Sequence, residues 1–415
     1  MKIAIIGSGI SGLTCGYLLH KEHDIHVFEA SDWVGGHTHT VNVTVKGQRY
    51  AIDTGFIVFN DWTYPNFIEL MSQLGVRSKA TEMSFSVRDS SNNLEYNGNT
   101  LNSLFAQRSN LLSPRFWGML RDILRFNREA IRDLQEQRIA SDTRLGDYLQ
   151  QRGYGTRFIE HYIVPMGAAI WSMSLADMLA FPLQFFVRFF KNHGLLSVSN
   201  RPQWRVIEGG SSAYVQPLSA GFADKIRLSC PVTSVERNEH GVLVRSATGS
   251  EHFDKVIFAC HSDQALQLLA NPSAAEQQIL GALPYAENDV VLHTDTRLLP
   301  DRKLAWASWN YRLGDAGLQR AAVTYDMNIL QGIQSETTFC VSLNQTASID
   351  PLKVLASYSY AHPQYSLDAV AAQARWQELH GEQHSYFCGA YWANGFHEDG
   401  VVSALRVAKA FGQQL

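Results

Sequence analysis

The hydrophobic positions at the start of the chain predict a strand, a helix and a second strand. Lys2 to Ile6 (KIAII) is a short apolar run typical of a buried strand, and the glycines after it lead into the helical pattern ISGLTCGYLLHKE. Asp24 to Glu29 (DIHVFE) predicts the second strand. Strands that alternate with helices in this way form parallel sheets covered by those helices. The chain therefore opens with a βαβ unit.

A helical pattern replaces this alternation from about residue 65 to residue 200. Its clearest stretch is SPRFWGMLRDILRFNREAIRDLQEQRI, in which Ser113 ahead of Pro114 is a favourable helix start with proline in the first turn. The apolar residues that recur there at intervals of three and four are Trp117, Leu120, Ile123, Leu124 and Ile131. We expect this stretch to form a long amphipathic helix.

Short strands return after residue 204. The stretch IRLSCPVTSVERNEHGVLVRSATGSEHFDKVIFAC has strand patterns separated by the turn sequences NEHG and ATGS. This pattern predicts an antiparallel meander that ends in the apolar strand Lys255 to Cys260. The C-terminal residues predict a strand (SYFCG), a glycine-containing loop and a helix (VVSALRVAKAFGQQL).

A chain of 415 residues is too long for one simple core, and its length fits two to three domains. We predict an α/β protein with two domains, each assembled from separate segments. Residues 1–64, 201–275 and 376–415 would form a Rossmann-like nucleotide-binding domain with a parallel sheet and a β-meander. Residues 65–200 and 276–375 would form an inserted α+β substrate-binding domain.

The composition excludes several classes of protein. Apolar residues make up 45% of the chain, and the net charge of −4, without a long run of Lys or Arg, argues against nucleic-acid binding. Five scattered cysteines with no CxxC pair indicate a reducing compartment and neither a disulfide framework nor a zinc site. The N-terminus lacks the apolar run of a signal peptide, and no window reaches the roughly 20 apolar residues of a spanning helix. We therefore expect a cytoplasmic protein.

A glycine-rich loop joins the first strand to the first helix. Gly7, Gly9 and Gly12 form G-x-G-x-x-G: the first permits the tight turn, the second lets a pyrophosphate approach, and the third lets helix and strand pack closely. Glu29 ends the second strand, where a carboxylate can accept both hydrogen bonds of an adenosine ribose diol. These features predict a dinucleotide with a free ribose, because a carboxylate would repel a 2′-phosphate. The alternative is a glycine-rich turn in another kind of α/β domain.

Four longer stretches add to this loop. They are IAIIGSGISGLTCGYLL with VFEASDWVGGHTHT, then DTGFIVFN, then VIEGGSSAYVQPL with CPVTSVE, and finally YFCGAYWANGFHEDGVVSALRVAKAF. Together they resemble the FAD-binding motifs of the flavin-containing amine oxidase superfamily, which includes phytoene desaturases and protoporphyrinogen oxidases. The resemblance covers about 150 residues, reaches both ends of the chain and implies an FAD cofactor.

The resemblance also implies which residues hold FAD. His37 takes the position after the Gly-Gly pair that is commonly an arginine, so it offers one or two donors depending on pH in place of a permanent charge. We interpret His37, Thr38 and Thr40 as cofactor-facing donors; structural histidines, a metal ligand and covalent flavin attachment are the alternatives, and no zinc-type spacing supports a metal. The FAD-binding residues we expect are Gly7, Gly9, Ser11, Gly12, Glu29, Gly35, Gly36, His37, Thr38, Thr40, Gly55, Phe56, Val232, Gly389, Val401 and Val402.

The start of the last helix is a further contact that the resemblance implies. Asp399 is a candidate N-terminal cap, and the amides of Gly400 to Val402 would face the flavin or its phosphates. Tyr391 and Trp392, just after Gly389, are the candidates for the substrate side of the flavin, and no catalytic acid or base is assigned.

The substrate is expected to be hydrophobic. No second G-x-G-x-x-G occurs, so the substrate itself would reduce FAD by hydride transfer, with oxygen or another carrier taking the electrons. Met178 to Leu196 holds five phenylalanines. This segment could line a tunnel for a lipid chain, dock on the inner face of a membrane through Arg188 and Lys191, or form plain helix core.

Four functions remain open at this point. The first is an FAD-dependent oxidoreductase (a desaturase, dehydrogenase or oxidase) that acts on a hydrophobic, lipid-like small molecule. The second is an amine oxidase, against which the lack of an obvious acidic cage counts. The third is an FAD-dependent double-bond isomerase, and the fourth is a non-catalytic flavin-bound partner of a lipid-modifying enzyme.

Overall fold

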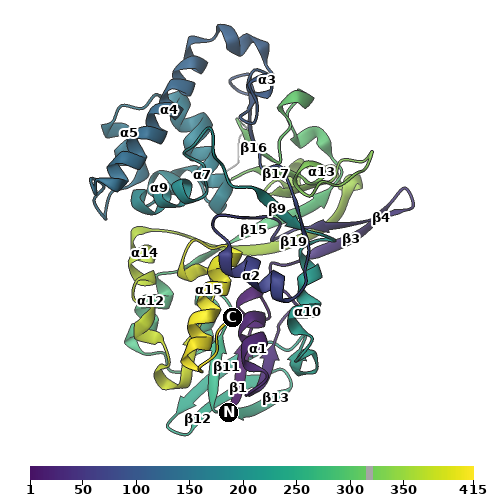
Figure 1. Ribbon diagram of the computed structural model, residues 1–415, viewed down its shortest axis with the longest axis vertical. Helices are drawn as coiled ribbons and strands as arrows, with labels where there is room; N and C mark the ends of the chain where they lie inside the picture. Colours follow the sequence, from purple (N-terminus) through teal and green to yellow (C-terminus); the bar gives the residue numbers. More distant parts are fainter. Residues whose placement is uncertain (315–320) are drawn as a thin grey trace.

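The computed structural model describes residues 1–314 and 321–415, and both chain termini lie in its lower half (Figure 1). A five-stranded parallel sheet runs through that half in the order β10-β2-β1-β14-β20. Its strands are β1 (Lys2–Ile6), β2 (Asp24–Phe28), β10 (Ile226–Arg227), β14 (Lys255–Phe258) and β20 (Ser385–Phe387). The predicted first strand is confirmed, and the second ends one residue before Glu29.

Both faces of this sheet are buried, which explains why its strands are continuous apolar runs. Ile3 and Ile5 pack on one side with α1 (Ile10–Leu19) and α15 (His397–Ala410). Ala4 and Ile6 point to the other side, because successive residues of a strand alternate between faces. That second core is closed by the meander and by α11 (Ser262–Leu268), α12 (Ala274–Gly281) and α14 (Leu367–Gln373).

The predicted meander is confirmed. It consists of β11 (Val232–Asn238), β12 (Gly241–Ser246) and β13 (Gly249–Phe253), which pair antiparallel. The two turns fall at the NEHG and ATGS sequences. The first residues of β11 follow Cys230, whose amide donates to the Glu29 carbonyl at 2.8 Å, so the meander begins beside the end of β2.

A seven-stranded mixed sheet forms the centre of the upper half, in the order β19-β15-β18-β17-β16-β7-β8. Its strands are β7 (Phe85–Asp89), β8 (Leu94–Asn97), β15 (Tyr285–His293), β16 (Trp309–Leu313), β17 (Val323–Asp326), β18 (Cys340–Leu343) and β19 (Val354–Pro363). The purely helical pattern expected after residue 65 is therefore wrong for the segment with β7 and β8. The reason is tertiary: β7 pairs in parallel with β16, which lies more than two hundred residues further along the chain.

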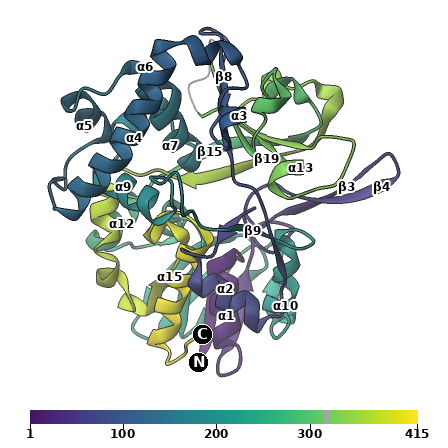
Figure 2. The ribbon, with the colours of Figure 1, turned by 45° about the horizontal axis from the view of Figure 1, so that its top comes forward.

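Helices cover one side of this upper half (Figure 2). They are α3 (Leu101–Leu104), α4 (Pro114–Gln135), α5 (Leu145–Gln151), α6 (Thr156–Phe158), α7 (Val164–Trp171), α8 (Leu175–Leu179) and α9 (Leu183–Asn192). The predicted start of α4 is confirmed, since Ser113 Oγ accepts from the Phe116 amide. Of the residues picked out by the spacing, Leu120, Ile123 and Ile131 pack against the core, whereas Trp117 and Leu124 are 50% and 56% exposed.

The phenylalanine-rich segment forms helix core. Phe181, Phe186, Phe189 and Phe190 are at most 4% exposed and surround the ring of Trp171. These four rings therefore face the core and not the solvent. Among the described residues, no helix combines the length and the apolar character that crossing a bilayer would need.

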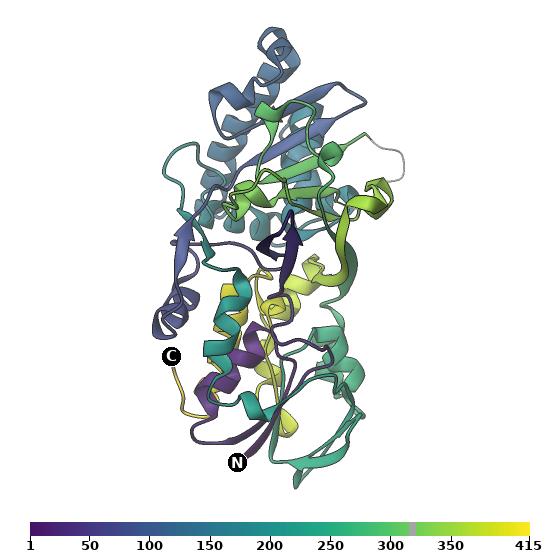
Figure 3. The same ribbon diagram turned by 90° about the vertical axis from the view of Figure 1, so that its right-hand side faces the viewer.

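Shorter elements connect the two halves, which are stacked along the long axis (Figure 3). They are the hairpin β3 (Thr40–Val45) and β4 (Gln48–Asp53) and the small sheet of β5 (Phe59–Asn60), β9 (Trp204–Ile207) and β6 (Ser78–Ala80). The helices α2 (Pro65–Gln73) and α10 (Val215–Ser219) pack on the core of the lower half, and α13 (Met327–Leu330) packs on that of the upper half. Residues 315–320, part of the 276–375 segment, lie outside the described residues.

Candidate functional site

The N-terminus of α1 offers an open anion-binding position. No protein atom lies within 4 Å of a Cβ atom placed on Gly9, no side chain caps the helix, and its first turn has no acidic residue. A Cβ atom on Gly12, in contrast, would lie 2.0 Å from the carbonyl oxygen of Gly7. Helix N-termini present unpaired amides and a positive dipole end. The space over Gly9 therefore fits a pyrophosphate, and Gly12 is required for close packing.

The Gly-Gly pair of VGGHTHTV lies directly beside this loop. Gly35 and Gly9 form a parallel bridge, and a Cβ atom on Gly36 would be 3.2 Å from the Gly9 Cα. Gly36 also has a φ of +58°, which residues other than glycine rarely adopt. The two glycine-rich segments thus form one surface.

Glu29 lies at the edge of the same surface. Its Oε2 accepts from the Ser8 amide at 2.9 Å and the Ser8 hydroxyl at 2.6 Å, and its Oε1 accepts from the Ser31 amide at 2.8 Å. An ionised carboxylate has about four acceptor positions. A ribose diol could therefore bind here by taking the place of the Ser8 hydroxyl.

His37 has a buried ring nitrogen without a partner. Its Nε2 makes no hydrogen bond to a described residue, and its ring centroid lies 5.2 to 5.8 Å from those of Tyr360, His362 and His261. Burial lowers the pKa of His37 and holds the pKa of both His261 and His362 at about 3, so all three imidazoles are neutral. The other ring nitrogen of His37 donates to the Ala361 carbonyl, so in the neutral ring the unpaired Nε2 is an acceptor, which a cofactor hydroxyl or N–H group would satisfy. No described group of histidine, cysteine and carboxylate side chains could hold a metal ion.

The two predicted threonine donors have other partners. Thr38 is fully buried, and its hydroxyl bonds to the Tyr214 hydroxyl and, at 2.9 Å, to His397 Nε2. The Thr40 hydroxyl donates to Asp53 Oδ1 at 2.6 Å. These side-chain hydroxyls therefore hold loops together, and their contact with the cofactor stays a prediction.

This polar network was not expected from the sequence. His397 stacks on the ring of Phe56 at 3.4 Å, and Gly55 lies against the backbone of His37. Asp53 is fully buried, accepts from the Ser211 amide at 2.8 Å, and burial raises its pKa to about 6. The network joins the Gly-Gly segment, the hairpin and the start of α15 into one rigid unit.

The remaining predicted cofactor residues either form contacts between elements or lie in the core. Ser11 donates to the Gly400 carbonyl at 3.0 Å, which ties α1 to α15, and the Gly389 amide donates to Ser403 Oγ at 2.8 Å. Val232, at the start of β11, lies near the end of β2. Val401 is fully buried in the core between α1 and α15, and Val402 is partly buried beside it.

The last helix begins earlier than expected. It starts at His397, so Asp399 lies inside its first turn and accepts from the Phe396 amide at 2.9 Å. The amides of the first turn are therefore those of residues 397–399, and not the amides of Gly400 to Val402. Tyr391 and Trp392 are 1% and 5% exposed and pack in the core behind the sheet, away from the pocket described next.

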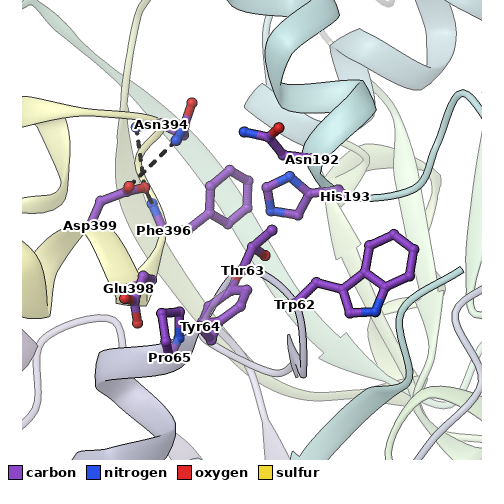
Figure 4. A pocket seen from close by; sticks show the side chains of 10 residues that line it. All are labelled: Trp62, Thr63, Tyr64, Pro65, Asn192, His193, Asn394, Phe396, Glu398 and Asp399. Atoms are coloured by element: carbon purple, nitrogen blue, oxygen red, sulfur yellow. Dashed lines mark hydrogen bonds between the residues drawn. The ribbon is translucent and has the colours of Figure 1, made fainter.

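A pocket of about 410 Å³ lies where the two halves meet, between α2, the end of α9 and the start of α15 (Figure 4). This volume lies within the range of small-molecule sites. The rings of Phe396 and His193 lie side by side in it. Its lining residues are Trp62, Thr63, Tyr64, Pro65, Asn192, His193, Asn394, Phe396, Glu398 and Asp399. The sequence analysis did not identify this set, because its members come from three distant segments.

The two carboxyl groups of the pocket, Glu398 and Asp399, have different hydrogen-bond partners. Glu398 caps α2: its oxygens accept from the Asn66 amide at 3.1 Å and the Phe67 amide at 2.9 Å. Asp399 accepts from the amides of Asn394 and Phe396, and burial raises its pKa to about 6. Asp399 is therefore the carboxyl group whose charge changes near neutral pH.

His193 contributes a neutral imidazole. Its Nδ1 lies 2.9 Å from the Phe189 carbonyl, which can only accept, so Nδ1 carries the proton and Nε2 is an acceptor. Burial lowers its pKa to about 4 and keeps the ring uncharged. The sequence contained no signal for this role, since His193 only interrupted an apolar stretch.

Comparisons with known proteins agree with this geometry. Residues 10–326 match the family described as flavin containing amine oxidoreductase. The AofH protein of Mycobacterium tuberculosis, provisionally named as a flavin-containing monoamine oxidase, is 25% identical over 272 residues, which are 62% of this chain and 56% of that protein. The chain thus spans little more than half the length of this relative.

Two solved structures have the same fold. Cyclohexylamine oxidase from Brevibacterium oxydans IH-35A is 15% identical with a TM-score of 0.68, and 99% of each chain is covered. The CLA-producing fatty acid isomerase from P. acnes is 14% identical with a TM-score of 0.69, over 99% of this chain and 98% of that one.

The matched region covers more than half of the chain, and the chain belongs to the flavin containing amine oxidoreductase family. Members of this family carry a flavin, normally FAD, which is the cofactor that the resemblance of the four longer stretches implied.

Proposed function

We propose that the protein oxidises a hydrophobic, lipid-like small molecule that binds in the pocket between α2, α9 and α15. The observation that supports this most is the shared position of α15. His397 at its start belongs to the network beside the Gly-Gly segment, while the neighbouring Phe396 and Asp399 line the pocket. A substrate in the pocket would therefore lie next to the surface assigned to FAD.

The residues proposed to hold FAD are those with free space or free polar atoms. The amides at the start of α1, over Gly9, would bind the pyrophosphate, and Glu29 would bind the adenosine ribose. His37 would accept a hydrogen bond from the cofactor through its unpaired Nε2, and Gly36 would allow close approach. The bound flavin would supply the chemistry by accepting two electrons from the substrate as a hydride.

The pocket residues would position the substrate and exclude water. Trp62, Tyr64 and Phe396 provide aromatic walls for an apolar body. His193 would accept a hydrogen bond from a substrate hydroxyl or amine through its Nε2. We also propose that residues 1–64, 201–275 and 376–415 act as the cofactor-binding part and the intervening segments as the substrate-binding part.

Anaerobic reduction of the bound flavin tests the proposed function. Purified protein should be yellow, and long-chain unsaturated or saturated lipids should bleach its flavin absorbance while small amines do not. Bleaching by amines alone would overturn the lipid assignment. A substrate whose double bond moves without net reduction would indicate an isomerase, and a flavin inert to every compound would indicate a non-catalytic partner.

An amine substrate is the second candidate, and Asp399 favours it. The sequence analysis counted the lack of an acidic cage against an amine oxidase, yet the structure brings Asp399 together with Trp62, Tyr64 and Phe396. Aromatic faces and a carboxylate are the groups that bind an ammonium ion. Asp399 is hydrogen-bonded to backbone amides, so it is held in place whether or not a cation is present.

The pH dependence of Asp399→Asn distinguishes these candidates. Asp399 has a pKa of about 6, above its ordinary value, because burial disfavours its charged form, so it is neutral below and charged above that pH. For an amine, kcat/KM should rise about tenfold per pH unit below pH 6 and level off above it, and the variant should lack this limb. For an uncharged lipid, wild type and variant should show the same profile. The measurement is kcat/KM of the wild type and of Asp399→Asn between about pH 5 and about pH 8, a range that includes the titration of the Asp399 carboxyl group.

A further inference from the structure

The end of the upper half carries an exposed apolar surface. Leu101, Leu111, Leu112 and Trp117 are 77%, 46%, 89% and 50% exposed, and they come from α3, the turn after it and the start of α4. In Figure 1 these elements form the end of the molecule opposite the N-terminus. Large side chains gathered at one exposed place indicate a binding surface, whereas single exposed ones do not. We call these four residues, with Arg115 and Arg121, the tip surface.

The charges of the tip surface have a single sign. Between Glu95 and Asp122 the chain contains no acidic residue and three arginines, Arg108, Arg115 and Arg121. All three are exposed. Asp122 is buried and accepts from the Gly155 amide, and its Oδ1 lies 3.9 Å from Arg121 Nε, so it offsets part of the Arg121 charge. The apolar side chains therefore lie beside exposed arginines with an excess of positive charge.

The tip surface is held in a defined shape. Thr100 and Ser113 cap the two helices, and the indole N–H of Trp117 donates to the Leu111 carbonyl at 2.9 Å. Its ring also lies 5.5 Å from that of Phe105. Leu101 and Leu112 project from this frame and contribute little to the core. Their exposure therefore does not serve the fold of the upper half.

We propose that the tip surface docks on a lipid bilayer that contains anionic lipids. Leucine and tryptophan side chains enter the interfacial region of a bilayer, and arginines beside them pair with anionic headgroups. This complementarity of charge favours a membrane over a second copy of the chain, because two arginine-bearing tips would repel each other. The inference stands apart from the proposed substrate, since it rests on a surface at the opposite end of the upper half from the pocket.

Co-sedimentation of the flavin-loaded full-length protein with vesicles tests this proposal. The protein should bind phosphatidylcholine vesicles that contain phosphatidylglycerol, bind those without it weakly, and be released by salt. Leu101→Asp with Leu112→Asp should abolish binding. Arg115→Gln with Arg121→Gln should weaken it by about fivefold per arginine.

Matched controls separate docking from folding. Val198→Asp changes an apolar side chain that is 73% exposed on the loop after α9, and Arg77→Gln removes a charge that is 84% exposed. Both should bind vesicles as the wild type does, and all variants should keep their flavin. The proposal is overturned if wild type ignores every vesicle, if the leucine variants bind normally, or if those variants only convert a dimer into a monomer.

Discussion

Gly9→Ala should lower the affinity for FAD by about a hundredfold while leaving the apoprotein as stable as the wild type. Alanine fits the backbone, since Gly9 has a φ of −67°, and its methyl group would meet no protein atom within 4 Å. That methyl group would occupy the space assigned to the pyrophosphate. Losing about two charge-assisted hydrogen bonds costs about 3 kcal/mol, which is roughly a hundredfold in Kd. Flavin fluorescence titration and thermal melting of the apoprotein measure both parts.

Gly12→Ala is the matched control, with the opposite expectation. Its methyl group would lie 2.0 Å from the Gly7 carbonyl oxygen, so α1 could not pack on β1 and the apoprotein itself should melt at a lower temperature. The pair thus separates a glycine needed for the ligand from one needed for the fold. Full FAD affinity in Gly9→Ala would place the pyrophosphate somewhere else.

Glu29→Ala should also lower the affinity for FAD, by an amount similar to that expected for Gly9→Ala. The carboxylate would accept two ribose hydroxyls, and loss of a charged double acceptor is expected to cost about 2–4 kcal/mol, or about 30- to 1,000-fold in Kd. Part of this effect would come from the protein, because Glu29 also holds the amides of Ser8 and Ser31. Flavin content after dialysis measures the loss.

Two variants divide these contributions. Ser8→Ala removes the hydroxyl that competes for Glu29 Oε2 and that also accepts from the Gly35 amide at 3.3 Å, so FAD retention should change much less than in Glu29→Ala. Glu29→Gln keeps the size and one acceptor oxygen, and should fall between wild type and alanine. If Glu29→Ala keeps its full complement of flavin, the ribose does not bind there.

The features predicted well from the sequence are local in the chain. The first βαβ unit, the meander with its two turns and the Ser113 start of α4 each depend on residues within about one element of each other. The cofactor class followed in the same way, because the G-x-G-x-x-G loop and Glu29 lie within one βαβ unit.

The features predicted poorly depend on distant partners. Strands β7 and β8 are short, and the sequence around them has a helical pattern, so they were not predicted. Strand β7 is stabilised by its pairing with β16. The hydrogen bonds of the Thr38 hydroxyl to Tyr214 and His397 were also not foreseen, because those residues lie far away in the sequence. The direction of a side chain within a loop follows from such contacts, which have no periodicity in the sequence.

The sequence alone determined the class of fold and the glycine-rich loop, because backbone geometry and glycine placement are encoded by neighbouring residues. The flavin was implied by the family resemblance of the four longer stretches. Only the tertiary structure decided where the substrate pocket lies, which carboxyl group there can change its charge, and which apolar residues face solvent. Those properties depend on burial and on contacts between segments hundreds of residues apart, such as Trp62, His193 and Asp399. Desolvation and packing act in space, so a one-dimensional pattern does not contain them.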